Sequence, residues 1–321
     1  MLLTYILLVL GFVVLIVAGD LLVRGAVSLA LFFGVSPLVI GLTIVGFGTS
    51  APELVISLDA ALTGSTDMAI GNVVGSNIAN LLLVLGLPAL ISRTNCNQTG
   101  IERNMIYVIL ATLLFIGLCY FGDLYIWQGL VLLAFLTFIL ITTARRSPRE
   151  LTAEIDDETA NKRNIWLQLL FVLVGLIGLP AGAHLIVTSG SEIARTFGIS
   201  EMVIGLTLVA IGTSLPELAA TTMAAFRGQA GLALGNVLGS CLFNLLAIMG
   251  ITMLIVPVPV PDALKNFDLW VMLAATLVLT PVFLRRANIT RMMGAALLIA
   301  YVAYIIAVFI PNGHSIVQAM L

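Results

Sequence analysis

A duplicated segment constrains this chain more than any other feature. Residues 39–53, VIGLTIVGFGTSAPE, return as residues 203–217, VIGLTLVAIGTSLPE, and 12 of the 16 positions from Val39 to Leu54 are identical in the second copy. Residues 69–82 return in the same way as residues 233–246, with 9 of 14 positions identical. The offset is 164 residues throughout, so neither copy carries an insertion. The chain is therefore built on an internal repeat.

The composition indicates that this repeat lies in a membrane. The chain is 60% apolar and 9% charged, whereas a soluble domain averages about 25% charged residues. Apolar runs of roughly 20 residues recur along it, which is typical of transmembrane helices. So few charges cannot cover the surface of a soluble protein, and no basic stripe for a nucleic-acid partner is present. We therefore interpret the chain as an integral membrane protein in contact with the lipid bilayer.

The apolar runs predict ten transmembrane helices. The opening run has no basic residue before it, so we interpret it as a retained helix and not as a signal peptide. The predicted spans are 2–18, 37–63, 69–91, 104–121, 125–142, 166–189, 201–227, 233–256, 267–284 and 292–311.

A polar interval divides these helices into two groups of five. Residues 144–164 form a predicted cytoplasmic linker between an N-terminal half, 1–143, and a C-terminal half, 165–321. The first half contains one copy of the repeat, at about 37–91, and the second half contains the other, at about 201–256.

The basic residues predict the orientation of the chain. Lysine and arginine concentrate in cytoplasmic loops of membrane proteins. Loops after even-numbered helices hold only Arg195 and Lys265. Loops after odd-numbered helices hold Arg24, Arg93, Arg103, Arg145, Arg146, Arg149, Lys162, Arg163, Arg227, Arg285, Arg286 and Arg291. This asymmetry places the odd-numbered loops in the cytoplasm and both termini outside.

An odd number of helices per half has a topological consequence. The second copy must enter the membrane with the opposite orientation to the first. Such inverted repeats are typical of secondary transporters, whose sites lie near the bilayer midplane where the repeats meet. The predicted fold class is all-α, with ten transmembrane helices arranged as two inverted five-helix repeats.

Each repeat places a glutamate near the middle of an apolar helix. Glu53 lies in the second predicted helix and Glu217 in the seventh. A charge at that depth costs roughly 3 kcal/mol on insertion scales. Glutamate in this position therefore indicates function, unless it is protonated and simply hydrogen-bonded between helices.

The sequence around both glutamates favours broken helices. Pro52 cannot donate a backbone hydrogen bond to Gly48, and Pro216 and Gly212 repeat the arrangement. Carbonyl groups freed in this way are tolerated at membrane depth only beside protein or a water-filled cavity. Hydroxyl groups stand next to the carboxylates, at Thr49, Ser50, Thr213 and Ser214. Such an all-oxygen set suits hard cations such as calcium, sodium or magnesium.

The third and eighth predicted helices add a second polar element. Gly71 and Gly75, repeated as Gly235 and Gly239, have the spacing that lets helices approach closely. Three polar residues share one face of each helix, and we expect them to complete the ion pathway. They are Asn72, Ser76 and Asn80 in the first copy, and Asn236, Ser240 and Asn244 in the second.

These paired elements, GTSxPE followed by GNxxGS, resemble the α-repeats of the calcium/cation antiporter superfamily, the sodium/calcium exchangers, and most closely their compact prokaryotic members. The resemblance implies a location in the cytoplasmic (inner) membrane of a prokaryote. It also implies that Glu53 and Glu217 bind calcium and, in alternation, sodium. It implies further ligands at Thr49, Ser50, Thr213, Ser214, Ser76, Asn80, Ser240 and Asn244, with backbone carbonyls at Gly46 and Ala210. Several relatives, including potassium-dependent exchangers, carry aspartate where this chain has Asn244. The asparagine leaves two carboxylates in the site and argues against potassium co-transport.

The predicted function is secondary active antiport, with calcium exported against inward sodium. Calcium and sodium are then transported ions, and no cofactor or obligate protein partner is expected. Proton-coupled calcium or other divalent-cation antiport by the same fold stays open, because buried glutamates can take up protons in place of sodium. An intramembrane hydrolase and a channel are less consistent with the residues. An enzyme would leave the symmetric polar residues unused, and inverted repeats argue against a channel.

Other polar residues in apolar stretches have weaker interpretations. Asp20 and Arg24, four apart, predict a local ion pair. His184 takes the place of Asp20 in the second repeat, and Asp59 lies six residues beyond Glu53, either merely hydrated or along an outer access route. The three cysteines lack the spacing of a metal site and predict no disulfide framework.

Overall fold

A computed structural model of the chain describes residues 2–145, 164–198 and 210–309. Every regular element in these ranges is helical, and two isolated antiparallel bridges join loops. Eight of the described helices are long and apolar enough to cross a membrane, and the broken pair Pro37–Thr49 and Ala51–Leu62 makes a ninth span. The predicted seventh span is described only from Ala210 onward.

The helices gather into two compact units, and each unit draws on both halves of the sequence. The first unit comprises residues 1–52 and 146–236, and the second comprises residues 53–145 and 237–321. The division falls within α4 (Ala51–Leu62) and α14 (Ala230–Leu242). Each copy of the repeat therefore contributes to both units.

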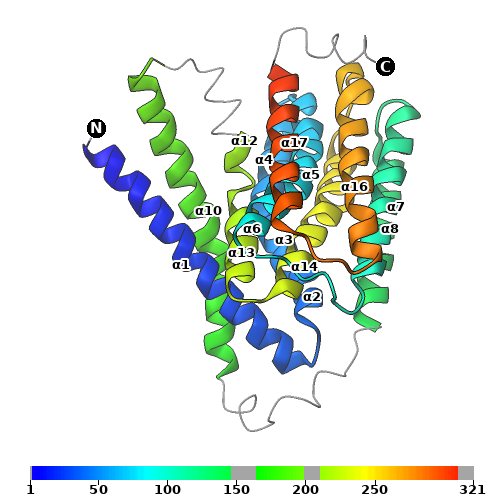
Figure 1. The fold of residues 1–321 in the computed structure, drawn as a ribbon. Coiled ribbons are helices and arrows are strands. Elements are labelled where there is room, and N and C mark those ends of the chain that lie inside the picture. The colour runs from blue at the N-terminus through cyan, green and yellow to red at the C-terminus, as the bar shows by residue number, and fades with distance from the viewer. Residues whose placement is uncertain (1, 146–163, 199–209, 310–321) are drawn as a thin grey trace. The chain divides into compact units, whose positions relative to one another are not determined.

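Two long helices, α1 (Leu2–Phe33) and α10 (Ile165–Thr196), dominate the first unit and lie side by side (Figure 1). Small residues allow this contact, because a Cβ atom on Gly182 would lie 3.0 Å from the Gly11 carbonyl oxygen. The unit also contains α2 (Pro37–Ile40), the π-helical η1 (Gly41–Val45), α3 (Gly46–Thr49), α12 (Ala210–Gly212) and α13 (Leu215–Phe226).

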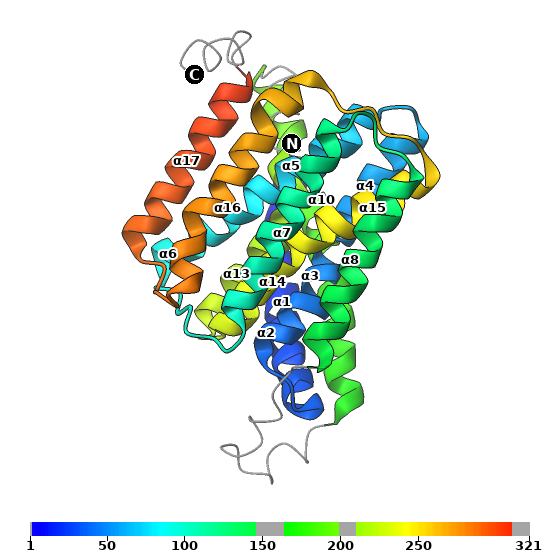
Figure 2. The ribbon, with the colours of Figure 1, turned by 90° about the vertical axis from the view of Figure 1, so that its right-hand side faces the viewer.

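The second unit is a set of helix pairs. The partners are α6 with α17, α8 with α15 and α7 with α16, and the last two pairs can be followed in Figure 2. A Cβ atom on Gly129 would lie 2.7 Å from the Gly250 carbonyl oxygen, so α8 and α15 also touch through small residues. The elements are α5 (Thr66–Ala79), η2 (Asn80–Val84), α6 (Leu85–Ile91), α7 (Ile101–Tyr120), α8 (Ile126–Arg145), η5 (Phe243–Ile248), α15 (Met249–Ile255), η6 (Leu264–Asp268), α16 (Leu269–Leu284) and α17 (Arg291–Phe309).

Two predicted helices were too short. The first was predicted over 2–18 but continues to Phe33, and the sixth was predicted over 166–189 but continues to Thr196. Arg24, predicted in a loop, therefore lies inside α1. A helix of 32 residues is about 48 Å long, whereas the hydrocarbon layer is about 30 Å thick. Both helices therefore extend beyond that layer. Charged side chains are compatible with a helix there, but they lower the local hydropathy, so a prediction from hydropathy stops too early.

The loop cysteine Cys96 gives a first prediction. The three cysteines are buried and form no disulfide, and burial raises the pKa of the Cys96 thiol to about 11. Because only the thiolate is reactive, we expect Cys96 to resist maleimide at pH 7.5 in folded protein and to react promptly after denaturation. Mass spectrometry of labelled peptides measures both. Rapid labelling of Cys96 in folded protein at pH 7.5 would contradict the buried position.

Candidate cation-binding site

Both predicted helix breaks are present and have the same backbone geometry. Ser50, with φ −85° and ψ 3°, separates α3 from α4, and Ser214, with φ −89° and ψ 1°, precedes α13. Pro52 and Pro216 then occupy the second residue of the following helix. A proline is tolerated there because the first N–H groups of a helix have no intrahelical partner. The prediction of broken second and seventh helices is confirmed.

The breaks determine where the two glutamates lie. Glu53 and Glu217 are each the third residue of a new helix, within its first turn. The N-terminus of a helix carries a partial positive charge, which stabilises a carboxylate placed there. Both side chains are 0% exposed. Each carboxylate is therefore withdrawn from solvent and supported by a helix end.

In the first unit, residues of one repeat contact the glutamate segment of the other. The Ser50 hydroxyl donates to Glu217 Oε1 at 3.2 Å, and the Thr49 hydroxyl donates to Asn236 Oδ1 at 3.1 Å. Ser214 is also buried and Thr213 is partly buried. The hydroxyls of the first GTS segment thus lie beside the carboxylate and amide of the second copy.

A close approach of two glycines makes these contacts possible. A Cβ atom on Gly235 would lie 2.3 Å from the Leu38 carbonyl oxygen, and one on Gly41 would lie 2.5 Å from the Leu232 carbonyl oxygen. The backbones of α14 and of the α2–η1 segment therefore touch. The predicted role in close helix packing is confirmed for Gly235. It is wrong for Gly71 and Gly75, where an added Cβ atom would meet no atom within 4 Å.

The first asparagine of each polar series has a structural role that was not predicted. Asn236 Nδ2 donates to the Glu217 carbonyl at 3.4 Å and to Thr221 Oγ1 at 2.9 Å. Asn72 Nδ2 donates to the Glu53 carbonyl at 3.4 Å and to Ser57 Oγ at 2.9 Å. Each asparagine thus fixes the backbone of its glutamate, and the two arrangements match across the repeat.

The second unit holds the other predicted ligands. Glu53, Ser76, Asn80, Ser240 and Asn244 are all buried. Neither amide atom of Asn80 or Asn244 has a hydrogen-bond partner among the described residues. An unsatisfied buried amide is destabilising, and most such groups in native proteins have a partner. The two amides are therefore available to a bound ion and its water.

Local π-helical turns place these two asparagines. Asn80 begins η2, and its repeat counterpart Asn244 lies in η5. A π turn adds one residue to the helix and re-aims the side chains around it, and such turns are frequent at functional sites. The hydropathy of the sequence predicted only a continuous span here. A π-helical segment of five or six residues is too short to change the spacing of apolar residues noticeably.

The remaining predicted residues are the two backbone ligands, Gly46 and Ala210, and the polar residues in apolar stretches. The Gly46 carbonyl accepts the Ser50 N–H at 3.2 Å, and Ala210 begins α12. His184 and Asp59 are exposed. Asp20 forms the predicted ion pair with Arg24 at 2.8 Å and a second pair with Arg227, which was not predicted.

The chemistry of this donor set is restricted. Within the described ranges, no three or more His, Cys, Asp or Glu side chains come together. The candidate ligands are carboxylates, hydroxyls, amides and backbone carbonyls, so oxygen is their common donor atom. Hard cations prefer such ligands, whereas soft cations prefer sulfur or imidazole.

Comparisons with known proteins agree with this fold. The profile of the family described as sodium/calcium exchanger protein matches residues 3–144 and 167–310. A putative antiporter, CaxA of Alkalimonas amylolytica, is 39% identical over 314 residues, which cover 95% of this chain and 98% of CaxA. The sodium/calcium exchanger MaX1 of Methanosarcina acetivorans is 32% identical and is covered to 98%, with 95% of this chain aligned.

A solved structure provides the fold comparison. The sodium-calcium exchanger NCX_Mj, soaked with 10 mM Na⁺ and no Ca²⁺, superposes with a TM-score of 0.83 at 33% identity. The alignment covers 95% of this chain and 98% of NCX_Mj. The architecture is therefore that of a ten-helix cation antiporter with two inverted repeats. The chain belongs to the sodium/calcium exchanger protein family, in its compact prokaryotic form, and is an integral membrane protein.

Proposed function

We propose that this protein exchanges sodium for calcium by alternating access, with Glu53 and Glu217 as the two charged ligands of one site near the bilayer midplane. The observation that carries the proposal is the buried contact between Ser50 of the first repeat and Glu217 of the second. A carboxylate withdrawn from water and lined by hydroxyls is suited to a cation that sheds its hydration shell. NCX_Mj and MaX1 are both named as sodium/calcium exchangers, and we extend those ions to this chain.

The remaining ligands follow from the same logic. Neutral oxygens supplement the two carboxylates, and we propose that they come from hydroxyls, amides and the carbonyls of Gly46 and Ala210. The hydroxyls and amides are those of Thr49, Ser50, Thr213, Ser214, Ser76, Ser240, Asn80 and Asn244. Two negative charges are balanced by one calcium ion or by sodium ions. An empty site would carry uncompensated charge through a low-dielectric medium, and this cost couples the two fluxes.

The orientation is also part of the proposal. Eleven of the fourteen basic residues fall in or next to loops after odd-numbered helices, and Arg24 lies in the same end of α1 that leads into such a loop. This supports a cytoplasmic position for those loops and an external position for both termini. A relative that is 34% identical over 295 residues is an inner membrane protein of Escherichia coli, YrbG. We therefore place this chain in the inner membrane of a prokaryote, where inward sodium drives calcium out.

Proton-coupled exchange at the same site is the second candidate. Glu217 Oε2 has no hydrogen-bond partner among the described residues. This oxygen can therefore carry a proton while Oε1 keeps its contact with Ser50, and protonation would neutralise the carboxylate as sodium does.

Calcium uptake into proteoliposomes separates the two candidates. Vesicles loaded with sodium and diluted into sodium-free medium should take up calcium, and vesicles with only a pH gradient should not. Uptake driven by the pH gradient alone would show that the coupling ion is the proton and not sodium. No calcium uptake under either gradient would refute calcium transport.

Replacing Ser50 gives a further prediction. Ser50→Ala removes a hydrogen bond to Glu217. A hydrogen bond to a charged group contributes roughly 1.5–3 kcal/mol, so we expect the calcium concentration for half-maximal uptake to rise by a factor of about 10 to 100. Concentration-dependent uptake measures this shift. Ser65→Ala, at an exposed position, is the control. An unchanged half-maximal concentration in Ser50→Ala would exclude Ser50 from the site.

A further inference from the structure

A basic cavity lies in the first unit, at residues to which the exchange site assigns no role. Its volume is about 330 Å³, within the range of ligand pockets. Arg24 of α1 and Arg227, which follows α13, line it together with Gln168 of α10 and Gln229. Three separate segments therefore direct nitrogen donors into one space.

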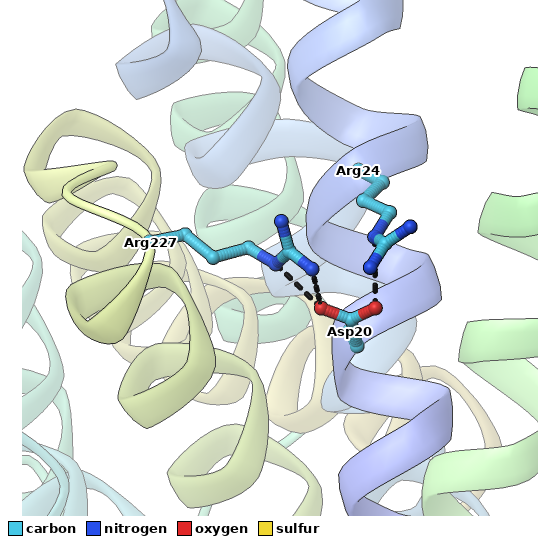
Figure 3. A network of polar contacts seen from close by, with 3 residues as sticks. All are labelled: Asp20, Arg24 and Arg227. Carbon is cyan, nitrogen blue, oxygen red and sulfur yellow. Dashed lines mark hydrogen bonds and ion pairs between the residues drawn. The ribbon is translucent and has the colours of Figure 1, made fainter.

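Asp20 holds the two arginines in place. Its carboxylate accepts Arg24 Nε at 2.8 Å on one oxygen, and Arg227 on the other (Figure 3). A guanidinium group has five N–H donors, so each arginine retains donors after this contact. The three charged groups together keep a net charge of +1. Both guanidinium groups are thus fixed in position without being neutralised.

The amide of Gln168 adds a neutral donor to the lining of the cavity. Gln168 is only 9% exposed and lines the cavity. Its side-chain amide is not among the fully enclosed unpaired polar atoms of the described residues, so it remains accessible from the cavity. An amide NH2 group in this position can donate to a ligand that enters the cavity. The cavity therefore presents a neutral donor beside two cations.

The position of the cavity along α1 places it near the membrane surface. Residues 2–19 of α1 carry no charge, and at 1.5 Å per residue they span about 27 Å, close to the hydrocarbon thickness. Asp20 and Arg24 come directly after this stretch, at the level of lipid head groups. Val27 and Phe171 supply an apolar wall to the same cavity.

We propose that this cavity binds a phosphate group, with Arg24 and Arg227 as its charged ligands and Gln168 as a neutral donor. Guanidinium groups match phosphate oxygens in pairs, and a phosphodiester carries the single negative charge that the cluster lacks. Basic pockets between transmembrane helices bind anionic lipid head groups. The apolar wall favours an anionic phospholipid as the source, and inorganic phosphate shares the same chemistry.

Thermal unfolding of the full-length protein in a neutral detergent tests the site. Additions of phosphatidylglycerol, phosphatidylcholine and inorganic phosphate are compared, since a ligand raises the unfolding temperature of the state that binds it. We expect phosphatidylglycerol to raise the midpoint saturably by about 3 °C or more, and phosphatidylcholine to have no such effect. The shift should disappear in Arg227→Gln, shrink in Gln168→Ala and persist in Arg285→Gln, an exposed arginine outside the cavity.

The variants distinguish the sources and keep the proposal refutable. A shift with inorganic phosphate that depends on the same residues supports the site and assigns it to a soluble ligand. Gln168→Ala leaves the Asp20 ion pairs intact, so it tests phosphate binding in the cavity even if Arg227→Gln does not fold. The proposal is overturned if neither ligand shifts the midpoint, or if Gln168→Ala and Arg227→Gln respond like the wild type.

Discussion

Sodium-driven calcium uptake is expected to fall to the level of protein-free vesicles when Glu217 is replaced by glutamine. The substitution keeps the shape of the side chain and the Ser50 contact but removes one of two negative charges. A single remaining carboxylate cannot balance a divalent ion in a buried site, so we expect the calcium affinity to fall by a factor of about 100 or more. Calcium flux into proteoliposomes measures the loss, and Glu53→Gln should reproduce it.

A stability measurement shows whether the loss arises from the site. Glu217→Gln removes a buried charge, so it should not lower the unfolding temperature in calcium-free buffer, whereas stabilisation by added calcium should disappear. Glu192→Gln, at an exposed position of α10, should retain both uptake and calcium stabilisation. Wild-type uptake in either glutamate variant would remove that residue from the proposed site.

The second large effect is expected at Gly235. An alanine there places its Cβ atom 2.3 Å from the Leu38 carbonyl oxygen, and a backbone group cannot rotate away as a side chain can. Overpacking of this kind is destabilising by roughly 1–3 kcal/mol. We expect Gly235→Ala to lower the unfolding temperature by several degrees, and to weaken calcium uptake by separating Thr49 from Asn236.

The matched control for Gly235 lies in a different helix. An added Cβ atom on Gly117 of α7 meets no atom within 4 Å, and alanine is the better helix former. Gly117→Ala should therefore unfold at or above the wild-type temperature. Equal unfolding temperatures for Gly235→Ala and the wild type would mean that α14 and the α2–η1 segment do not touch as described.

Much of the architecture follows from the sequence. The repeat with its constant offset, the apolar runs and the odd number of helices per half together predicted ten helices in two inverted repeats. Pro52 and Pro216 predicted the breaks beside both glutamates, because proline removes a hydrogen bond whatever its surroundings. These features depend on neighbouring residues or on the number of helices in each half, so the sequence alone determined them.

Other features depend on residues that are distant in the sequence. The contact of Ser50 with Glu217 joins positions 167 residues apart, and the ion pair of Asp20 with Arg227 joins positions 207 residues apart. The unsatisfied amides of Asn80 and Asn244 arise from burial and π-helical turns, which hydropathy does not record. The sequence by itself determined the helical architecture, the two helix breaks and the position of a glutamate beside each break, although not the full length of α1 and α10. Only the tertiary structure decided which donors meet which carboxylate, because that depends on how closely glycine backbones let distant helices pack.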